Sequence, residues 1–366
     1  MQPHIPASLP PSDLQLESVI ALVGRANACL SRYDGLLESL VNPEILLSPL
    51  LMKEAELSSR IEGTIATANE VYRRQAGEEF EPGKTADIHE IMNYRQTLRT
   101  AGSLLKTQPV SLHMIRQMHE NLMDGVRGQD KSPGQFRRTQ NWIGPKGCTL
   151  ENATYVPPPA MILDSLLENF ITYVNVTDDE IDPIVQTALV HAQFEMIHPF
   201  DDGNGRIGRL LIPIFLMKKN CLVSPSLYIS RYLESHRDQY YDHLSRISSE
   251  GDWLGWVRFF LTALISQAEN NLMLTRKVIE LYDRTKLEII SHLHTDQAIH
   301  ILDLLFDTPV FLAKDLHQRL GIQRQRAAMY IRSLKEAGII EELRPASGRK
   351  SALLSFERLW DITDQQ

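Results

Sequence analysis

Two strongly apolar segments with helical spacing, residues 183–197 and 204–218, are separated by only six residues, and this break constrains the fold more than any other feature of the chain. The first helix is expected to end just before Pro199, because proline disfavours helical geometry in the residue that precedes it. Asn204 lies between two glycines, and all three residues tolerate positive φ angles. The sequence therefore predicts two helices joined by a tight, glycine-rich turn over residues 198–203.

This turn carries residue types that are suited to phosphate chemistry. A glycine-rich turn at a helix start presents free backbone N–H groups and a partial positive charge, which favour a bound phosphate. Arg206 and Arg209 lie in the first turn of the second helix, where cations oppose the macrodipole unless an anion is bound between them. Asp202 supplies a carboxylate of the kind that binds Mg²⁺ together with substrate phosphates. His198 titrates near neutrality and is therefore the expected general base for a hydroxyl nucleophile.

Residues 198–209, HPFDDGNGRIGR, resemble the signature HxFx[D/E]GNGRxxR of the Fic (filamentation induced by cAMP) family and match every fixed position of it. The resemblance implies a helical domain, roughly over residues 90–270, that transfers AMP from Mg·ATP to a protein hydroxyl. It implies that His198 deprotonates this hydroxyl, that Asp202 holds Mg²⁺ and that Phe200 is a core anchor. It also implies an anion hole and a clamp for the outer phosphates of ATP, formed by Gly203, Asn204 and Gly205 and by Arg206 and Arg209, respectively.

Three alternatives to AMP transfer remain open at this stage. Glu195 and His198 form a Glu-x-x-His pair like those of di-iron helical bundles, but such sites need a second copy, and the chain contains one. A nucleotide-sensing, DNA-binding transcriptional regulator is a second alternative, although a pure sensor needs no base at position 198. The third is a Fic variant that removes AMP or transfers another phosphate-containing group. Phosphate transfer occurs in the Doc branch, whose signature departs from this one in the glycine turn.

A second segment, SSRIEG, resembles the [S/T]xxxE[G/N] motif of the Fic class that is inhibited from its N-terminal side. The matching residues are Ser58, Glu62 and Gly63. The resemblance implies that the Glu62 carboxylate pairs with Arg209 and denies this guanidinium to the γ-phosphate of ATP. The alternative is an ordinary exposed glutamate followed by a glycine that ends a helix.

Fic proteins also carry a β-hairpin flap that aligns the backbone of the target by strand addition, and residues 139–156 are the candidate for it. Two short apolar runs flank a Gly-Pro-Lys-Gly turn in this segment. The alternative is an ordinary surface hairpin that packs its aromatic side chains on the helices. Farther along, SRYLESHRDQYYDHL resembles a stretch common in this class, in which Tyr240 or Tyr241 stacks on adenine. We take Tyr241 as the adenine-binding candidate, with core packing as the alternative.

Helical periodicity dominates the rest of the chain, so the fold class is predicted to be mainly α, with the flap as the exception in the catalytic part. Residues 125–160 are rich in glycine and proline and are expected to be irregular. The remaining helical patterns cover residues 12–72, 87–107, 111–124 and 161–291.

The last part of the chain resembles a winged helix-turn-helix, with three helices followed by two strands around a turn. Its third helix carries Arg324, Arg326, Arg332 and Lys335, a basic face that suits a DNA major groove. The unit as a whole contains about as many acids as bases, so a structural role or a homodimer contact is the alternative to DNA binding. The predicted domains are an N-terminal helical region with the inhibitory motif, the Fic catalytic domain and this winged unit, at residues 1–88, 89–291 and 296–366.

Composition and net charge indicate the cellular compartment and the kinds of partner to expect. The net charge of −8 gives no overall electrostatic case for a nucleic-acid or anionic-membrane partner. The three cysteines are scattered and odd in number, which fits a reducing cytoplasm without disulfides. The N-terminus has no basic region leading into an apolar one, and no run of 18 apolar residues occurs. We therefore expect a cytoplasmic protein without a membrane partner, whose partners are ATP and a target protein, itself included.

Overall fold

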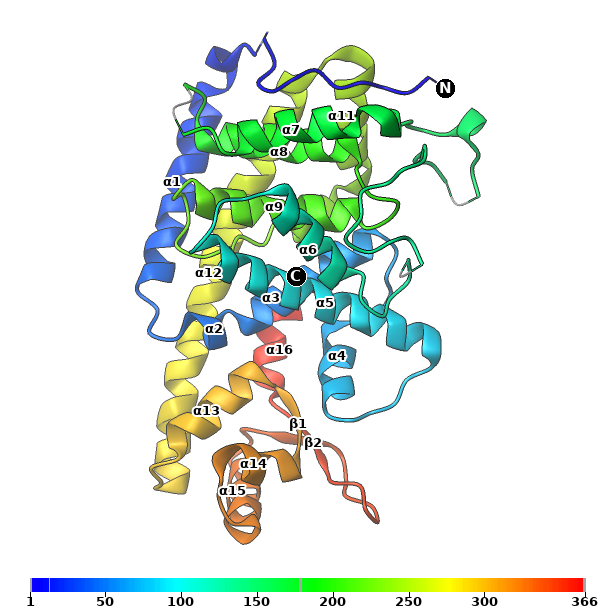
Figure 1. The fold of residues 1–366 in the computed structure, drawn as a ribbon. Coiled ribbons are helices and arrows are strands. Elements are labelled where there is room, and N and C mark those ends of the chain that lie inside the picture. The colour runs from blue at the N-terminus through cyan, green and yellow to red at the C-terminus, as the bar shows by residue number, and fades with distance from the viewer. Residues whose placement is uncertain (1, 13, 129, 146, 178–179, 365–366) are drawn as a thin grey trace.

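The computed structural model describes residues 2–12, 14–128, 130–145, 147–177 and 180–364, and it is mainly helical, as predicted (Figure 1). The helices before the signature are η1 (Leu16–Val19), α1 (Ile20–Glu38), α2 (Pro43–Leu46), α3 (Ser48–Ile61), α4 (Ala68–Gln75), α5 (Pro82–Leu105), α6 (Leu112–Leu122), η2 (Leu150–Asn152), η3 (Ala160–Ile162) and α7 (Leu163–Val174). The signature joins the next two helices, and the chain continues with α8 (Pro183–Ile197), α9 (Asn204–Lys218), α10 (Ser230–Ser235), α11 (Arg237–Glu250) and α12 (Trp253–Leu293).

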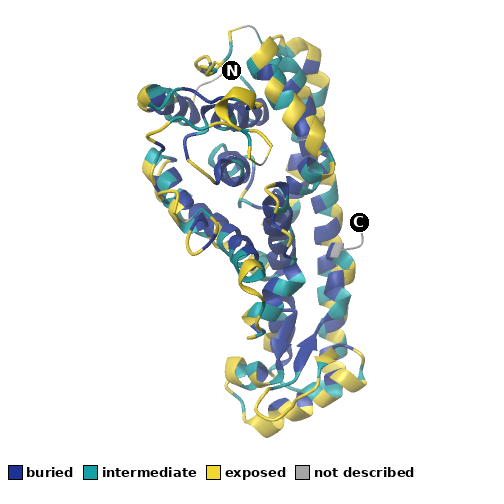
Figure 2. Ribbon diagram, turned by 90° about the vertical axis from the view of Figure 1, so that its right-hand side faces the viewer, coloured by how far each residue is buried: buried dark blue, intermediate teal, exposed yellow. Residues whose placement is uncertain are grey.

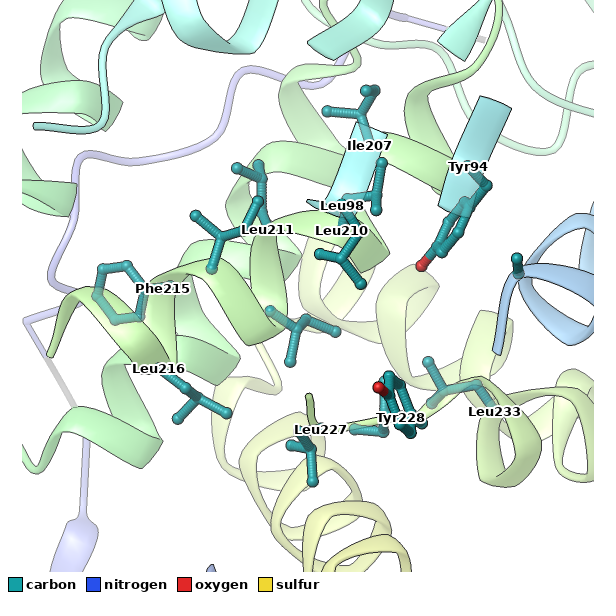
Figure 3. Packing of buried hydrophobic residues seen from close by; sticks show 14 of the residues in the cluster. Tyr94, Leu98, Ile207, Leu210, Leu211, Phe215, Leu216, Leu227, Tyr228 and Leu233 are labelled. Carbon is teal, nitrogen blue, oxygen red and sulfur yellow. The ribbon is translucent and has the colours of Figure 1, made fainter. Parts of the chain in front are cut away.

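The two helices predicted around the signature are confirmed as α8 and α9. Pro183 occupies the first position of α8, and the Asp182 carboxylate accepts a hydrogen bond from the Ile184 N–H at 2.8 Å. A proline at the first position and an aspartate cap are both favoured at helix N-termini, and they act together here. Nearly every residue of α8 and α9 is buried, because their apolar residues face neighbours on all sides. Figure 3 shows part of this packing, in which Ile207, Leu210 and Leu211 of α9 lie near Leu98 of α5.

The helical pattern predicted over residues 12–72 is divided into shorter elements. Pro43 and Pro49 each lie in the first turn of a new helix, where proline needs no intrahelical N–H bond. α3 ends before Gly63, which adopts a φ of 95° that disfavours other residue types. These breaks turn α3 into a separate helix whose C-terminal end points to the signature turn.

The 41-residue helix α12 runs along much of the molecule, and at 1.5 Å per residue it is ~60 Å long. Its first half packs on α1, α8 and α11 in the main core, where Trp256 donates a hydrogen bond to the Ala188 carbonyl at 2.8 Å. Its second half contributes Val278, Leu281 and Ile289 to a second core with the C-terminal unit. Among the described residues, no helix has the length and apolarity needed to cross a membrane.

The C-terminal unit contains a short antiparallel sheet with strand order β1-β3-β2. Leu354 pairs with Phe311 on one side and with Glu342 on the other. The helix α16 was not predicted; its Trp360 contacts Tyr72 edge-on at 5.5 Å, so the chain end folds back on the N-terminal region. The elements of the unit are α13 (Ala298–Asp307), β1 (Val310–Leu312), α14 (Ala313–Leu320), α15 (Arg324–Glu336), β2 (Glu341–Arg344), β3 (Leu353–Ser355) and α16 (Glu357–Asp364).

Candidate functional site

The turn between α8 and α9 is held by its own residues. His198 ends α8 in the left-handed region at φ 49°, and Gly203 precedes α9 at φ 78°. The Asn204 side chain accepts from the Phe200 N–H and donates to the Phe200 carbonyl, both at 2.8 Å. This amide is therefore committed to the turn, and only the backbone of Asn204 can face an anion. Among the described residues, no side chain caps α9, so its first N–H groups remain available to a ligand.

His119 of α6 packs against this turn, and no local sequence pattern indicates this role. Its Nδ1 accepts from the Gly134 N–H at 2.9 Å, so Nε2 carries the proton and donates to the Asp202 carbonyl at 2.9 Å. The ring stacks on Phe200 with centroids 3.7 Å apart. Burial lowers the pKa of His119 to about 4, so the ring stays neutral and keeps this hydrogen-bond pattern at pH 7.

His198 is in the state that a general base requires. Its Nδ1 lies 3.3 Å from the Glu195 carbonyl, which can only accept, so Nδ1 carries the proton and Nε2 presents a lone pair. Burial lowers the pKa of His198 to about 4, although the bond to Glu195 acts in the opposite direction. The imidazole is consequently neutral at pH 7, although the Glu62 charge also acts to raise its pKa.

Arg209 is 1% exposed and is enclosed by the C-terminal end of α3. Its Nε donates to the Ser58 hydroxyl at 2.9 Å, and its Nη2 donates to the Ser58 carbonyl at 2.9 Å and to Glu62 Oε1 at 2.7 Å. Burial alone would raise the pKa of Glu62, but the Arg209 charge and hydrogen bond outweigh it and the pKa is lowered. Glu62 is therefore ionised here, and the structure brings together two residues that lie far apart in the sequence.

Arg206 also has acidic neighbours, but they lie farther from its guanidinium than Glu62 lies from that of Arg209. It is 3% exposed and lies 3.4 Å from Glu90 of α5 and 3.6 Å from Asp202. Its Nε and Nη1 are buried without a hydrogen-bond partner in the part of the chain that the structure describes. A buried guanidinium with open donors is suited to an anionic ligand. Glu90, which also pairs with Arg127 at 2.9 Å, is a site residue that the motif did not reveal.

The signature turn and the C-terminal end of α3 border a cavity of about 630 Å³. Its wall includes His198, Glu62 and Arg209, together with Asp202, whose side chain is 46% exposed. Tyr241 is 41% exposed on this cavity and can present its ring to a ligand. Tyr240 lines the same wall but is buried, and its hydroxyl lies 2.9 Å from His191 Nε2. Of the two candidate tyrosines, Tyr241 is therefore the one placed to stack on a base.

The candidate flap is less regular than a hairpin of two strands. A single bridge joins Ile143 and Tyr155, with the Ile143 N–H donating to the Tyr155 carbonyl at 2.8 Å. Lys146 of the predicted turn lies outside the described residues. Tyr155 donates to the Met196 carbonyl at 2.8 Å and anchors the segment on α8, while Trp142 is 43% exposed beside the cavity. The short pairing reflects the glycine and proline residues between the two runs.

Within the described ranges, no group of three or more His, Cys, Asp or Glu side chains is arranged to hold a metal ion. Mg²⁺ bound with a nucleotide does not need such a group, because phosphate oxygens and water provide most of its ligands. Asp202 fits this role through its chemistry and position. Its carboxylate accepts from the Gly203 N–H at 2.6 Å, lies 3.6 Å from Arg206 and lines the cavity.

Two family models match the chain, "Fic/DOC family N-terminal" over residues 20–102 and "Fic/DOC family" over residues 109–216. The "Protein adenylyltransferase Fic" of Culex quinquefasciatus is 31% identical to it over 184 residues, which are 48% of this chain and 33% of that protein. The chain thus spans about a third of the length of the curated relatives that it matches.

Solved structures share the fold. A Fic family protein from Desulfovibrio desulfuricans G20 aligns with 97% of this chain and 98% of its own, with a TM-score of 0.58 and 22% identity. Fic-1 from C. elegans aligns with 73% of this chain and 74% of its own, with a TM-score of 0.52 and 20% identity. Since the two models, both of this family, together match more than half of the sequence, and the second includes the signature turn, the chain belongs to the Fic/DOC family.

Proposed function

We propose that this protein is an adenylyltransferase that moves AMP from ATP to a Ser, Thr or Tyr hydroxyl of a protein. The observation that carries this proposal is the cavity, whose wall contains a neutral histidine, the N-terminus of α9 and the buried Arg209. The names of the curated relatives support the same chemistry. The target oxygen attacks the α-phosphorus, the bond to the bridging oxygen of the β-phosphate breaks, and pyrophosphate leaves.

Each group of the cavity has a part in this step. His198 Nε2 takes the proton of the attacking hydroxyl, which contributes about 10²–10⁴ in rate. The backbone N–H groups of Gly203, Asn204 and Gly205 stabilise the charge on the α-phosphate, and Arg206 and Arg209 hold the outer phosphates. Mg²⁺, when bound with ATP to Asp202, would offset the charge that develops on the leaving pyrophosphate. Tyr241 stacks on adenine.

We further propose that Glu62 inhibits this reaction in the resting protein. The carboxylate already occupies the Arg209 donor that an outer phosphate needs, at 2.7 Å. Ser58 holds the other edge of the guanidinium, and Gly63 ends α3 at the point where Glu62 can turn inward. ATP would then bind without its outer phosphate in the productive place.

Transfer of label from ATP distinguishes this function from its alternatives. Glu62→Gly should become labelled by α-labelled ATP with Mg²⁺ and not by γ-labelled ATP, and Glu62→Gly with His198→Ala should lose the label. His113→Ala, at an exposed histidine of α6, is the matched control and should not change transfer. Label from γ-labelled ATP would indicate phosphate transfer, and loss of previously attached AMP would indicate removal of AMP. ATP binding with no transfer in any form would indicate a nucleotide sensor.

A second candidate function, DNA binding by a winged helix-turn-helix, rests on the exposed face of α15. Arg324, Gln325 and Arg332 are exposed on this helix, and residues 345–350 between β2 and β3 are exposed as well. Both features lie at the end of the molecule that is remote from the signature turn (Figure 1, Figure 2). A basic helix beside a wing fits a major groove with the wing on the phosphates. We keep the homodimer contact as the alternative role.

This surface is tested with duplex DNA and the full chain. Replacing Arg324 and Arg326 by alanine should lower the slope of log affinity against log salt by about 2, because each lost phosphate contact removes roughly 0.9. Alanine at Arg25 and Arg32, two exposed arginines of α1, is the matched control. Absent binding, or a slope that the α15 substitutions leave unchanged, would favour the homodimer contact, which sedimentation would then test.

A further inference from the structure

Glu195 is a cavity residue to which the proposed reaction assigns no role. It lies on α8, one turn before His198, and its carboxyl lies against Gly208 in the second turn of α9. Its Oε1 atom is buried and has no hydrogen-bond partner among the residues that the structure describes. An unsatisfied buried carboxyl oxygen costs stability unless a ligand completes it, which makes Glu195 a candidate for a ligand contact.

Two glycines of α9 make room for two carboxyl groups on the same side of this helix. A Cβ atom at Gly205 would lie 2.2 Å from Glu62 Oε1, and one at Gly208 would lie 2.1 Å from Glu195 Oε1. Both distances exclude any side chain larger than glycine at the present carboxyl positions. Position 208 is variable in the signature, so the signature does not account for a glycine there. The close approach of Glu195 Oε1 does account for it.

His191 and Tyr240 lie beside Glu195, and both direct their donors to other groups. His191 Nδ1 donates to the Gly208 carbonyl at 3.0 Å, because a carbonyl can only accept. His191 Nε2 is then the acceptor for the Tyr240 hydroxyl at 2.9 Å, so the proton of this hydroxyl points away from Glu195. The Glu195 carboxyl is left to interact with whatever occupies the cavity.

Burial raises the pKa of Glu195 to about 8; the Arg209 charge acts against this rise, and the Glu62 charge adds to it. At pH 7 the group is therefore mainly a neutral acid with an O–H to donate. The other groups that face it do not titrate between about pH 6.5 and 9.5. The pKa values of His191 and His198 are lowered to about 3 and 4, those of Tyr240 and Tyr241 are raised, Arg209 remains charged, and the pKa of Glu62 is lowered.

We propose that Glu195 is a specificity residue of the nucleotide site, which donates a hydrogen bond to the outermost phosphate of ATP beside Arg209 and thereby favours ATP over ADP. This inference rests on the proposed function, because it places that phosphate where the Glu62 carboxylate now lies. A neutral carboxylic acid adds an O–H donor beside the N–H donors of the guanidinium, and this strengthens binding of the phosphate. The same group as an anion would repel it.

The sign of the pH dependence follows from this arrangement. The bound phosphate favours the protonated acid, so the complex has the higher pKa of the two states. ATP affinity is then complete below the pKa of the free protein and falls as pH rises through it, by up to about tenfold per pH unit. In Glu62→Gly the fall should begin at lower pH, because Glu62 no longer raises the pKa of Glu195.

The test measures affinity by calorimetry for the non-transferable analogues α,β-methylene-ATP and α,β-methylene-ADP between pH 6.5 and 9.5. The parent is Glu62→Gly, and the variants add Glu195→Gln, which keeps a donor without titrating, or Glu195→Ala, which has none. Glu168→Gln, at an exposed glutamate of α7, is the matched control. The parent should lose about tenfold or more of its ATP-analogue affinity across this range, and Glu195→Gln should change by less than about threefold. Glu195→Ala should bind weakly at every pH.

Equal pH profiles for the parent and Glu195→Gln would overturn the proposal. An equally large effect of Glu195→Ala on the ADP analogue would overturn it too, because Glu195 would then contact the inner part of the nucleotide. These outcomes are separate from failure of the proposed function, which is a parent that binds the ATP analogue but transfers no α-label from ATP. Thermal melting of each variant establishes that it is folded.

Discussion

Replacing Glu62 by glutamine is expected to destabilise the ligand-free protein, because it leaves a buried guanidinium without its counter-charge. Arg209 is 1% exposed, and removing one partner of a buried ion pair costs about 3–5 kcal/mol. The Glu62 side chain is 32% exposed, so solvent screens part of the interaction and the cost falls to roughly 2 kcal/mol. For a chain of this size, that loss lowers the melting temperature by roughly 3 °C.

Mg·ATP should reverse this loss in the variant, since the outermost phosphate then supplies the missing negative charge. At a ligand concentration of 100 Kd, binding to the folded state adds about 2.7 kcal/mol. Wild-type protein, in which Arg209 is already paired, should gain less from the same nucleotide. Differential scanning fluorimetry with and without Mg·ATP measures both quantities.

The matched control for this prediction is Glu78→Gln. It makes the same chemical change in the pair of Arg73 and Glu78, whose side chains are 39% and 23% exposed. An exposed pair contributes only ~0.2–1 kcal/mol, so this variant should melt within about 2 °C of wild type. The reasoning is refuted if Glu62→Gln is as stable as wild type, or if ATP stabilises both proteins equally.

Three further predictions follow from the geometry of the signature turn. In Glu62→Gly, the acid limb of the pH–rate profile should lie near pH 4, because burial lowers the pKa of His198 to about 4. The base is protonated and lost only as pH falls through that value, so an acid limb between pH 6 and 7 would contradict this prediction. Asp202→Ala should weaken ATP binding in Mg²⁺ but not in its absence, with the exposed Asp201→Ala as control, and calorimetry showing an unchanged metal dependence would exclude Asp202 as a ligand. His119→Ala should lower kcat of Glu62→Gly more than it raises KM, because it removes the 2.9 Å hydrogen bond to the Asp202 carbonyl and the stacking on Phe200. Unchanged kinetics would show that the turn keeps its shape without His119.

Local patterns predicted the centre of the fold well. α8 and α9 begin and end where their apolar periodicity does, because proline and glycine act on the residues next to them. α16 was missed, since eight residues after a strand give too short a pattern to separate a helix from a loop. Its position is set by Trp360 packing on the N-terminal region, which is a long-range contact.

The site shows the same division between local and tertiary information. The signature named the residues that lie on one turn, and the second motif named Glu62, which the structure places on Arg209. His119 and Glu90 carry no recognisable pattern, and the pattern that includes Glu195, a Glu-x-x-His pair, is typical of di-iron sites. Each of the three matters through a partner that folding brings near. The adjacent Tyr240 and Tyr241 could not be separated by sequence, since only burial distinguishes a core tyrosine from one that faces the cavity.

The central claim, that Glu62 restrains an AMP transferase by occupying Arg209, is tested most directly by label transfer in a double-mutant cycle. Wild type, Glu62→Gly, Arg209→Ala and the double variant are incubated with α-labelled ATP and Mg²⁺, and protein-bound label is measured alongside melting temperature. We predict low labelling of wild type, a strong gain in Glu62→Gly, and loss of that gain in the double variant, because the freed guanidinium is needed to hold the outer phosphate. Wild-type labelling in a folded Glu62→Gly, or a gain that survives Arg209→Ala, would contradict the account.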